Sequence, residues 1–232
     1  MNTFLMILFI TLCVGAASAF VYMRVTHVGL QAFWTKLIAS ALFVVGGVVA
    51  LIMKDNAPNY MFFVVLGLFF GMVGDLLNEL KVVYRPHEKQ YMTGSLVVFG
   101  LGHIMYVIGL TMVAAASKSI IVPIFVSLAL GSVLATILLV NSNNVGIDFN
   151  SHKSLVFAYT FVLSISTAYA IALAVILPRL WMFAAGMLLF LVSNVVFAFI
   201  NWGFKNSNKM HIVNLSTYYV AQILIMITLF VL

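Results

Sequence analysis

The sequence predicts an all-α fold, a polytopic membrane bundle with eight transmembrane helices. Hydrophobic residues make up 65% of the 232 residues and charged residues only 7%, against about 25% charged in a typical soluble domain. The mean hydropathy is +1.20, which is more apolar character than a soluble core absorbs. Inside a bilayer only helices and closed barrels satisfy the backbone hydrogen bonds. The apolar runs are long and do not alternate with polar residues, which favours helices over strands.

Each predicted span has about 20 mostly apolar residues, the length that crosses the hydrocarbon core. We place the spans at residues 3–22, 32–53, 60–80, 93–116, 119–140, 154–177, 180–202 and 211–231. Polar and turn-forming segments separate them, including a charged loop at 81–90 and a polar linker at 141–153. No loop is long enough for a soluble domain, so we expect residues 1–232 to form one transmembrane domain.

The first span resembles a secretory signal, because apolar residues 4–14 precede the small residues Ala17, Ser18 and Ala19. Residues 1–3 carry no lysine or arginine, although the leading region of a signal peptide requires one. The apolar run also continues past this site, so we expect a retained span. Cys13 is the only cysteine, which excludes an internal disulfide.

The basic residues are divided unequally between the two sides of the predicted bundle. Eight fall on the side reached after the first span and three on the opposite side: Arg24, Lys36, Lys81, Arg85, Lys89, Lys153, Lys205 and Lys209 against Lys54, Lys118 and Arg179. The positive-inside rule places the first side in the cytoplasm and both termini outside. The net charge of +6 is spread over short loops, so the sequence indicates no nucleic-acid partner.

Asp75 is the most informative single residue. The chain has five acidic residues; Asp55, Glu88 and Asp148 fall in predicted loops, and Glu79 lies at the end of the third span. Asp75 alone lies well inside a span, where an ionised carboxylate costs on the order of 3 kcal/mol by insertion scales, so it is a candidate functional residue by default.

The residues around Asp75 predict that it faces protein. Gly67, Gly71 and Asp75 are spaced by four and share one helix face, and the Gly-x-x-x-Gly pattern allows another helix to approach closely. Glu79 lies one turn further along this face, nearer water.

Polar residues of four other spans fall at a similar depth, in the half of the bundle that we assign to the cytoplasm. They are Lys36 in the second span, His103 and Tyr106 in the fourth, Asn194 in the seventh, and Tyr218 and Gln222 in the eighth. His103 and Tyr106 are three apart and share a face. We therefore expect a polar cavity that opens toward the cytoplasm.

Each of these features also has a purely structural explanation. The glycine pattern is more often a packing motif, and Asn194 or Gln222 alone is more often interhelical glue. Tyr219 fits equally well in an interfacial aromatic belt. Lys36 also fits a snorkelling anchor, Glu79 an interfacial residue, and a lone His103 a buried, satisfied histidine.

Motifs for several chemistries are absent. The sequence contains no His-Glu-x-x-His, no Cys/His cluster and no pair of intramembrane carboxylates for a two-metal site. It also lacks a Gly-x-Ser-x-Gly elbow and the glycine loops of nucleotide-binding proteins. We therefore expect no metal and no cofactor.

Five segments resemble the YhhN-type lysoplasmalogenases, and together they cover most of the chain with the same number of spans. The segments are GLFFGMVGDLL at 67–77, FGLGHIMY at 99–106, WTKL at 34–37, LLFLVSN at 188–194 and YYVAQ at 218–222. Two positions depart from the family pattern: Leu37 replaces the usual proline, and Asn194 stands where many members have aspartate. Glu79 is not part of the pattern.

The resemblance implies an integral-membrane hydrolase that cleaves the vinyl ether bond of lysoplasmalogen, releasing a fatty aldehyde and glycerophosphocholine or glycerophosphoethanolamine. The reaction needs a proton donor, a stabiliser for an oxocarbenium-like cation and a held water, and a carboxyl group supplies the first two. The implied acid/base is Asp75. The resemblance implies that His103, together with Tyr106, positions the water or shuttles a proton. Lys36 is expected to bind the phosphate, and Asn194, Tyr218 and Gln222 to line the site.

The implied location is a bacterial cytoplasmic membrane, with both termini outside and the site open to the cytoplasm. The partners are then the lipid bilayer and a lysophospholipid substrate. Two other classes stay open: a proton-coupled lipid or small-solute transporter with Asp75 as its protonation switch, and a non-catalytic membrane scaffold. The oligomeric state is not predicted.

Overall fold

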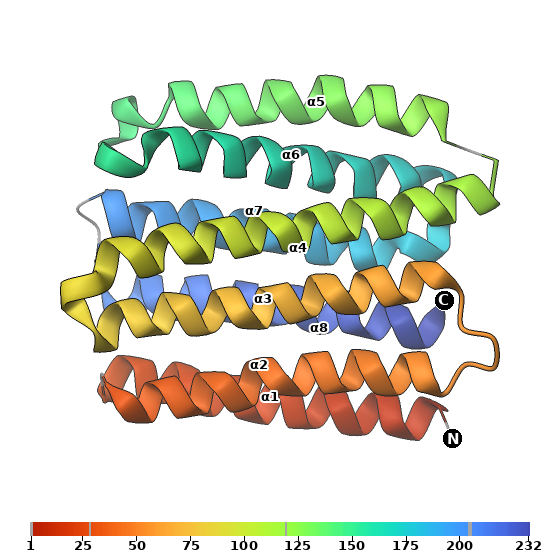
Figure 1. Ribbon diagram of the computed structural model, residues 1–232, viewed down its shortest axis with the longest axis horizontal. Coiled ribbons are helices and arrows are strands. Elements are labelled where there is room, and N and C mark those ends of the chain that lie inside the picture. Colours follow the sequence, from red (N-terminus) through yellow and green to blue (C-terminus); the bar gives the residue numbers. More distant parts are fainter. Residues whose placement is uncertain (1, 28, 119, 204–205) are drawn as a thin grey trace.

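The computed structural model describes residues 2–27, 29–118, 120–203 and 206–232, and these ranges form a bundle of roughly antiparallel helices (Figure 1). The long helices in the described residues are α1 Asn2–Thr26, α2 Leu30–Ile52, α3 Asn59–Val83, α4 Glu88–Ala116, α5 Ile121–Val140, α6 Lys153–Ile176, α7 Trp181–Trp202 and α8 Asn208–Val231. All eight are long and apolar enough to cross a membrane. The predicted fold class, an all-α bundle with eight candidate spans, is confirmed.

Several helices are longer than the apolar runs that predicted them. The prediction of a charged loop at 81–90 was wrong in length: the loop is shorter, because α3 continues to Val83 and α4 begins at Glu88. Hydropathy marks only the part of a helix that crosses hydrocarbon, whereas helical hydrogen bonding extends into the polar interface. The reversal is a short 3₁₀ turn at Arg85–His87, and Pro86 lies in its first positions, where its missing N–H is tolerated.

Helices that are consecutive in the chain pack as pairs: α1 with α2, α3 with α4, α5 with α6, and α7 with α8. The last helix closes the bundle, because α8 also contacts α1, α2 and α3. In Figure 1 α5 lies at one edge and α1 with α2 at the other, and both termini lie at the same end. Elements from the two ends of the sequence therefore meet around α3.

Glycines allow α3 and α4 to approach closely, as the Gly-x-x-x-Gly pattern predicted. A methyl group added at Gly67 would overlap the ring of Tyr106, and one at Gly102 would lie 3.1 Å from the Gly67 carbonyl oxygen. A methyl at Gly71 would lie 2.9 Å from the Gln222 amide nitrogen of α8. The glycine face of α3 thus packs against protein on two sides, and Asp75 lies on it.

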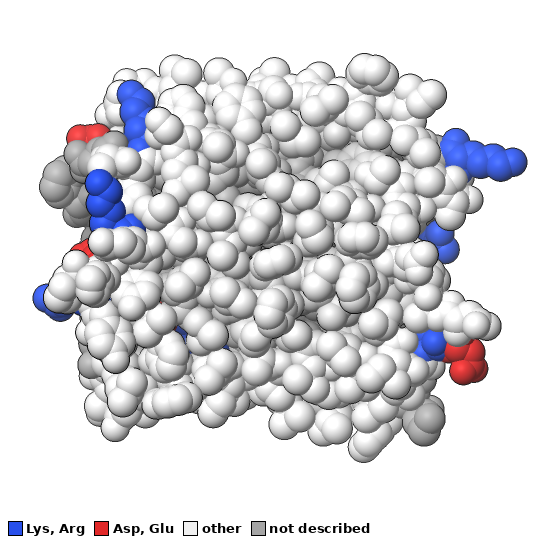
Figure 2. Space-filling view, in the orientation of Figure 1, with Lys and Arg blue, Asp and Glu red and all other residues white. Residues whose placement is uncertain are grey.

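Charged side chains lie at the two ends of the bundle, and the face in Figure 2 is uncharged between them. One end holds the end of α1, the α3–α4 turn and the starts of α4, α6 and α8, with Arg24, Lys81, Arg85, Lys89, Lys153 and Lys209. We call this the basic end; Lys205, which the sequence also assigns there, lies outside the described residues. Lys54, Lys118 and Arg179 belong to the opposite end.

Candidate active site

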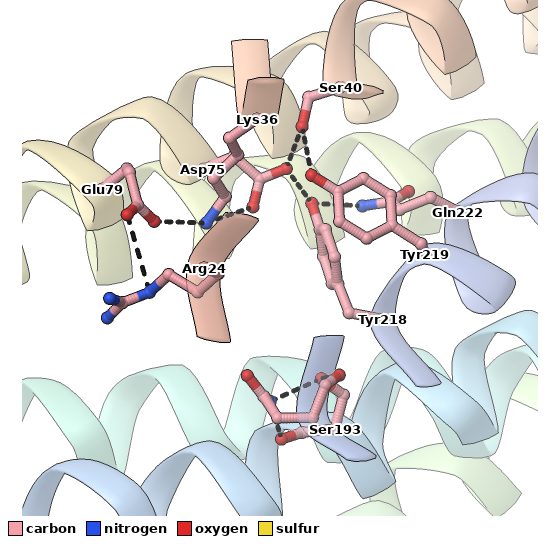
Figure 3. A network of polar contacts seen from close by, with 10 residues as sticks. Arg24, Lys36, Ser40, Asp75, Glu79, Ser193, Tyr218, Tyr219 and Gln222 are labelled. Atoms are coloured by element: carbon pink, nitrogen blue, oxygen red, sulfur yellow. Dashed lines mark hydrogen bonds and ion pairs between the residues drawn. The ribbon is translucent and has the colours of Figure 1, made fainter. Parts of the chain in front are cut away.

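Asp75 is buried between α2, α3 and α8, with 2% of its surface exposed. Its Oδ2 accepts hydrogen bonds from the Ser40 hydroxyl at 2.6 Å and from the Tyr218 hydroxyl at 2.7 Å. Its Oδ1 lies 3.4 Å from Lys36 Nζ. Figure 3 shows these groups converging on the carboxylate. Three donors from two helices therefore fix both oxygens of the acid, as a buried carboxylate requires.

Lys36 and Glu79 continue the network toward the basic end (Figure 3). Lys36 Nζ lies 3.8 Å from Glu79 Oε2, and Arg24 Nε lies 3.6 Å from Glu79 Oε1. Lys36 is 2% exposed and Glu79 is 3% exposed. The snorkelling alternative for Lys36 was therefore wrong, because its ammonium group does not reach the surface. Glu79, which the sequence predicted to lie nearer water, is also covered by the surrounding helices.

Residues of α8 extend the network away from the basic end. The Gln222 amide donates to the Tyr218 hydroxyl at 3.0 Å, and the Tyr106 hydroxyl of α4 donates to Gln222 Oε1 at 3.2 Å. Tyr219 is 2% exposed, and its hydroxyl lies 3.2 Å from Ser40 Oγ. Tyr219 is thus a buried neighbour of the site and not part of an aromatic belt.

His103 and Asn194 are not hydrogen-bonded to the Asp75 network. Among the described residues neither ring nitrogen of His103 has a hydrogen-bond partner. The centre of its ring lies 4.6 Å from the centre of the Phe190 ring. Asn194 accepts from the Tyr159 hydroxyl at 2.8 Å and donates to the Phe190 carbonyl at 2.9 Å. The structure therefore brings Lys36, Tyr218, Gln222 and Tyr106 into one network with Asp75, but neither His103 nor Asn194.

Four residues complete the network although the sequence analysis did not assign them to the site: Ser40, Glu79, Tyr219 and Arg24. Ser40 gives no signal of its own, although it follows Lys36 by four residues and therefore shares its helix face. Arg24 sits at the end of α1, and nothing in the sequence shows which helix that end meets.

A cavity of about 30 Å³ lies beside Asp75, which is room for one or two water molecules. Polar groups from α2, α3, α4, α7 and α8 line it: Lys36, Asp75, Asn78, Ser95, Ser193, Asn194, Asn214 and Tyr218. These are the five helices from which the sequence predicted a polar cavity. We call this space the polar cavity.

An apolar pocket of about 300 Å³ adjoins the polar cavity. It lies between α4, α5, α6 and α7 and is lined mainly by aliphatic and aromatic side chains, including Leu163 and Val195. Leu96, Asn194 and Phe197 line both spaces. Asn194 therefore stands where the two spaces meet.

Toward the basic end, a cavity of about 40 Å³ shares Lys36, Asn78 and Asn214 with the polar cavity. It shares Arg24, Lys81 and other residues with a wider space of about 420 Å³, which we call the vestibule. The vestibule, the two small cavities beside Lys36 and Asp75, and the apolar pocket thus adjoin one another in this order. A carboxyl group in such a place has a cation, two hydroxyls and room for water beside it, which suits proton transfer to an amphiphilic molecule.

Comparisons with curated proteins and with solved structures gave no match. The chain does match the YhhN family over residues 31–229. This range begins in α2 and ends in α8, and it contains every residue of the Asp75 network except Arg24. The chain belongs to the YhhN family.

Proposed function

We propose that this protein is a lysoplasmalogenase, which hydrolyses the vinyl ether of a single-chain alkenyl glycerophospholipid to a fatty aldehyde and a glycerophospho-headgroup. The observation that carries the proposal is the position of Asp75. It lies beside a water-sized polar cavity, with an apolar pocket on one side and a charged vestibule on the other. Membership of the YhhN family supports the same reaction.

The apolar pocket suits the alkenyl chain. A lipid whose chain lies there has its vinyl ether at the boundary with the polar cavity, close to Leu96, Asn194 and Phe197, which line both spaces. Burial of the chain excludes bulk water from the reacting atoms, which strengthens the electrostatic interactions around them. The few waters that the polar cavity holds then supply the nucleophile.

Asp75 acts as acid and then as base. In its protonated form it transfers a proton to the β-carbon of the vinyl ether, and the π electrons form the new C–H bond. The resulting oxocarbenium ion faces the carboxylate, which stabilises the positive charge. A water adds to the cationic carbon and returns its proton to Asp75, giving a hemiacetal. As the hemiacetal collapses, its hydroxyl proton passes to the glycerol oxygen and the C–O bond to glycerol breaks. This releases the aldehyde, so one water is consumed overall.

The other network residues position this acid. Ser40 and Tyr218 hold Oδ2, and Lys36 lies beside Oδ1. Since Lys36 already lies between the acids Asp75 and Glu79, we assign it to positioning Asp75 and not to the substrate phosphate. Gln222 holds Tyr218.

Tyr106, Asn194 and His103 play supporting roles in the proposal. Tyr106 fixes the other end of Gln222, and Asn194 borders the chain pocket. His103 packs against Phe190, which lines the polar cavity. We therefore treat His103 as a positioning residue that acts through the Phe190 ring.

The distribution of basic residues supports an orientation. By the positive-inside rule the basic end lies in the cytoplasm, so the vestibule opens to the cytoplasmic leaflet and both termini lie outside. The substrate then enters from the leaflet in which it is already dissolved.

Aldehyde release from choline and ethanolamine lysoplasmalogens by the protein purified in detergent tests the proposal. Asp75→Asn keeps the size of the side chain and removes the acid, and we expect it to lower the rate at least about a hundredfold. The matched control is Asp55→Asn, the same change at an exposed loop residue at the opposite end, which should release aldehyde at the normal rate. An Asp75→Asn variant as active as the control would remove Asp75 from the mechanism. No aldehyde from the unaltered protein would favour the transporter.

A further inference from the structure

The vestibule at the basic end contains a buried cation that the proposed reaction does not use. Lys81 is 7% exposed, and its Nζ donates to Asn201 Oδ1 at 2.5 Å. The same nitrogen lies 5.1 Å from the centre of the Phe197 ring. Among the described residues no carboxylate lies within ion-pair distance of Lys81, although Lys36 has two.

A buried ammonium group is stable only when an anion or several acceptors compensate it. One amide oxygen and one aromatic face compensate the charge of the Lys81 ammonium group only weakly. Its side chain lines both the vestibule and the smaller cavity that leads to Lys36. An anion in the vestibule would complete its coordination.

The other vestibule residues make this space suitable for an anion. Arg24 and Arg85 line it together with Lys81, and Glu88 is the acid among the lining residues. Asn201, Asn206, Asn208 and His211 add further polar groups. The volume of about 420 Å³ accommodates a phosphate ester with an attached headgroup.

We propose that the vestibule is a phosphodiester-binding subsite for the headgroup of a single-chain glycerophospholipid, with Lys81 as its central cation and Arg85 as a second. Guanidinium and ammonium groups are the usual partners of phosphate oxygens. Glu88 supplies a negative charge at the same entrance, which suits the ammonium of a choline or ethanolamine headgroup.

The spacing along α3 agrees with this assignment. The direction in which we place the lipid rests on the proposed function. Lys81 follows Asp75 by six residues, which is about 9 Å along the helix axis. A glycerophosphate unit and the lysine side chain together bridge this separation. A phosphate held at Lys81 therefore leaves the first glycerol carbon, which carries the vinyl ether, near Asp75 and the chain in the apolar pocket.

Equilibrium binding of uncleavable ligands tests the subsite independently of catalysis. The probes are an alkyl-ether lysophosphocholine, the matching alkylglycerol without phosphate, and inorganic phosphate, each titrated against the full-length protein in detergent. We expect Lys81→Met to weaken binding of the lysophosphocholine about tenfold to hundredfold, the loss of one charged hydrogen bond, and to leave alkylglycerol binding unchanged. Lys89→Met, the same charge change at an exposed residue of the basic end, should alter neither.

Three results would overturn the subsite. In the first, Lys81→Met weakens the binding of lysophosphocholine and of alkylglycerol equally. In the second, Lys81→Met and Lys89→Met weaken lysophosphocholine binding equally, and in the third, inorganic phosphate binds as tightly as the lysophosphocholine. Arg85→Gln, at an exposed position, repeats the comparison if Lys81→Met fails to fold, with a loss of severalfold expected. Phosphate-dependent binding without aldehyde release would leave the subsite standing and reject the proposed reaction, so the two proposals fail separately.

Discussion

Replacement of Lys36 by methionine should destabilise this protein, although the change removes a charge from a membrane span. Insertion scales predict the opposite, since an apolar residue replaces lysine in the span at a gain of up to about 3 kcal/mol. The structure reverses the expected sign because Lys36 is the shared counter-ion of Asp75 and Glu79. Without it, two carboxylates that are 2% and 3% exposed stay buried with less compensation.

The size of the effect follows from the two distances. At 3.4 Å and 3.8 Å, Coulomb's law with an effective dielectric constant of 20 gives about 5 and about 4 kcal/mol of attraction. The desolvation of the ammonium group is recovered in the variant, and Asp75 keeps its hydrogen bonds from Ser40 and Tyr218. Measurements on broken buried ion pairs then lead us to expect a net loss of about 3–5 kcal/mol.

Equilibrium unfolding in mixed detergent micelles measures this loss. The double variant Lys36→Met/Asp75→Asn also removes the Asp75 carboxylate, which Lys36→Met leaves buried without its counter-ion. It should therefore be at least about 1 kcal/mol more stable than Lys36→Met alone. Lys89→Met, at an exposed site, should change stability by no more than about 0.5 kcal/mol. A Lys36→Met variant as stable as the unaltered protein would refute the view that Lys36 neutralises these acids.

Three further changes probe the site, its packing and the chain pocket. Tyr218→Phe removes the 2.7 Å hydrogen bond to Asp75, and we expect a loss of about 1–3 kcal/mol in unfolding experiments and at least tenfold slower aldehyde release. Gly67→Ala places a methyl group against the ring of Tyr106, which should destabilise the protein by about 1–3 kcal/mol; unchanged stability would show that the ring moves aside freely. Val195→Phe narrows the apolar pocket, so it should lower kcat/KM for long alkenyl chains about tenfold relative to short ones, and an equal effect on all chain lengths would contradict chain binding there.

The sequence determined the features that depend on local composition. Long apolar runs require helices in a bilayer, so the eight helices followed directly. Asp75 stood out as the candidate functional residue because acids are rare inside a span. The glycine spacing on α3 also predicted close packing, which Gly67 and Gly102 show. Boundaries were less accurate, as at α4, because hydropathy does not mark where a helix ends in the polar interface.

The tertiary structure alone decided which side chains meet. A helix face specifies direction around one axis, but the partner across the interface depends on how eight helices are ordered in space. That order places Arg24 of α1 beside Glu79 and Ser40 of α2 beside Asp75, contacts that no spacing along the chain encodes. It also packs His103 against Phe190 and leaves its ring nitrogens without a hydrogen bond to the Asp75 network, because burial at equal depth does not by itself bring two side chains into contact.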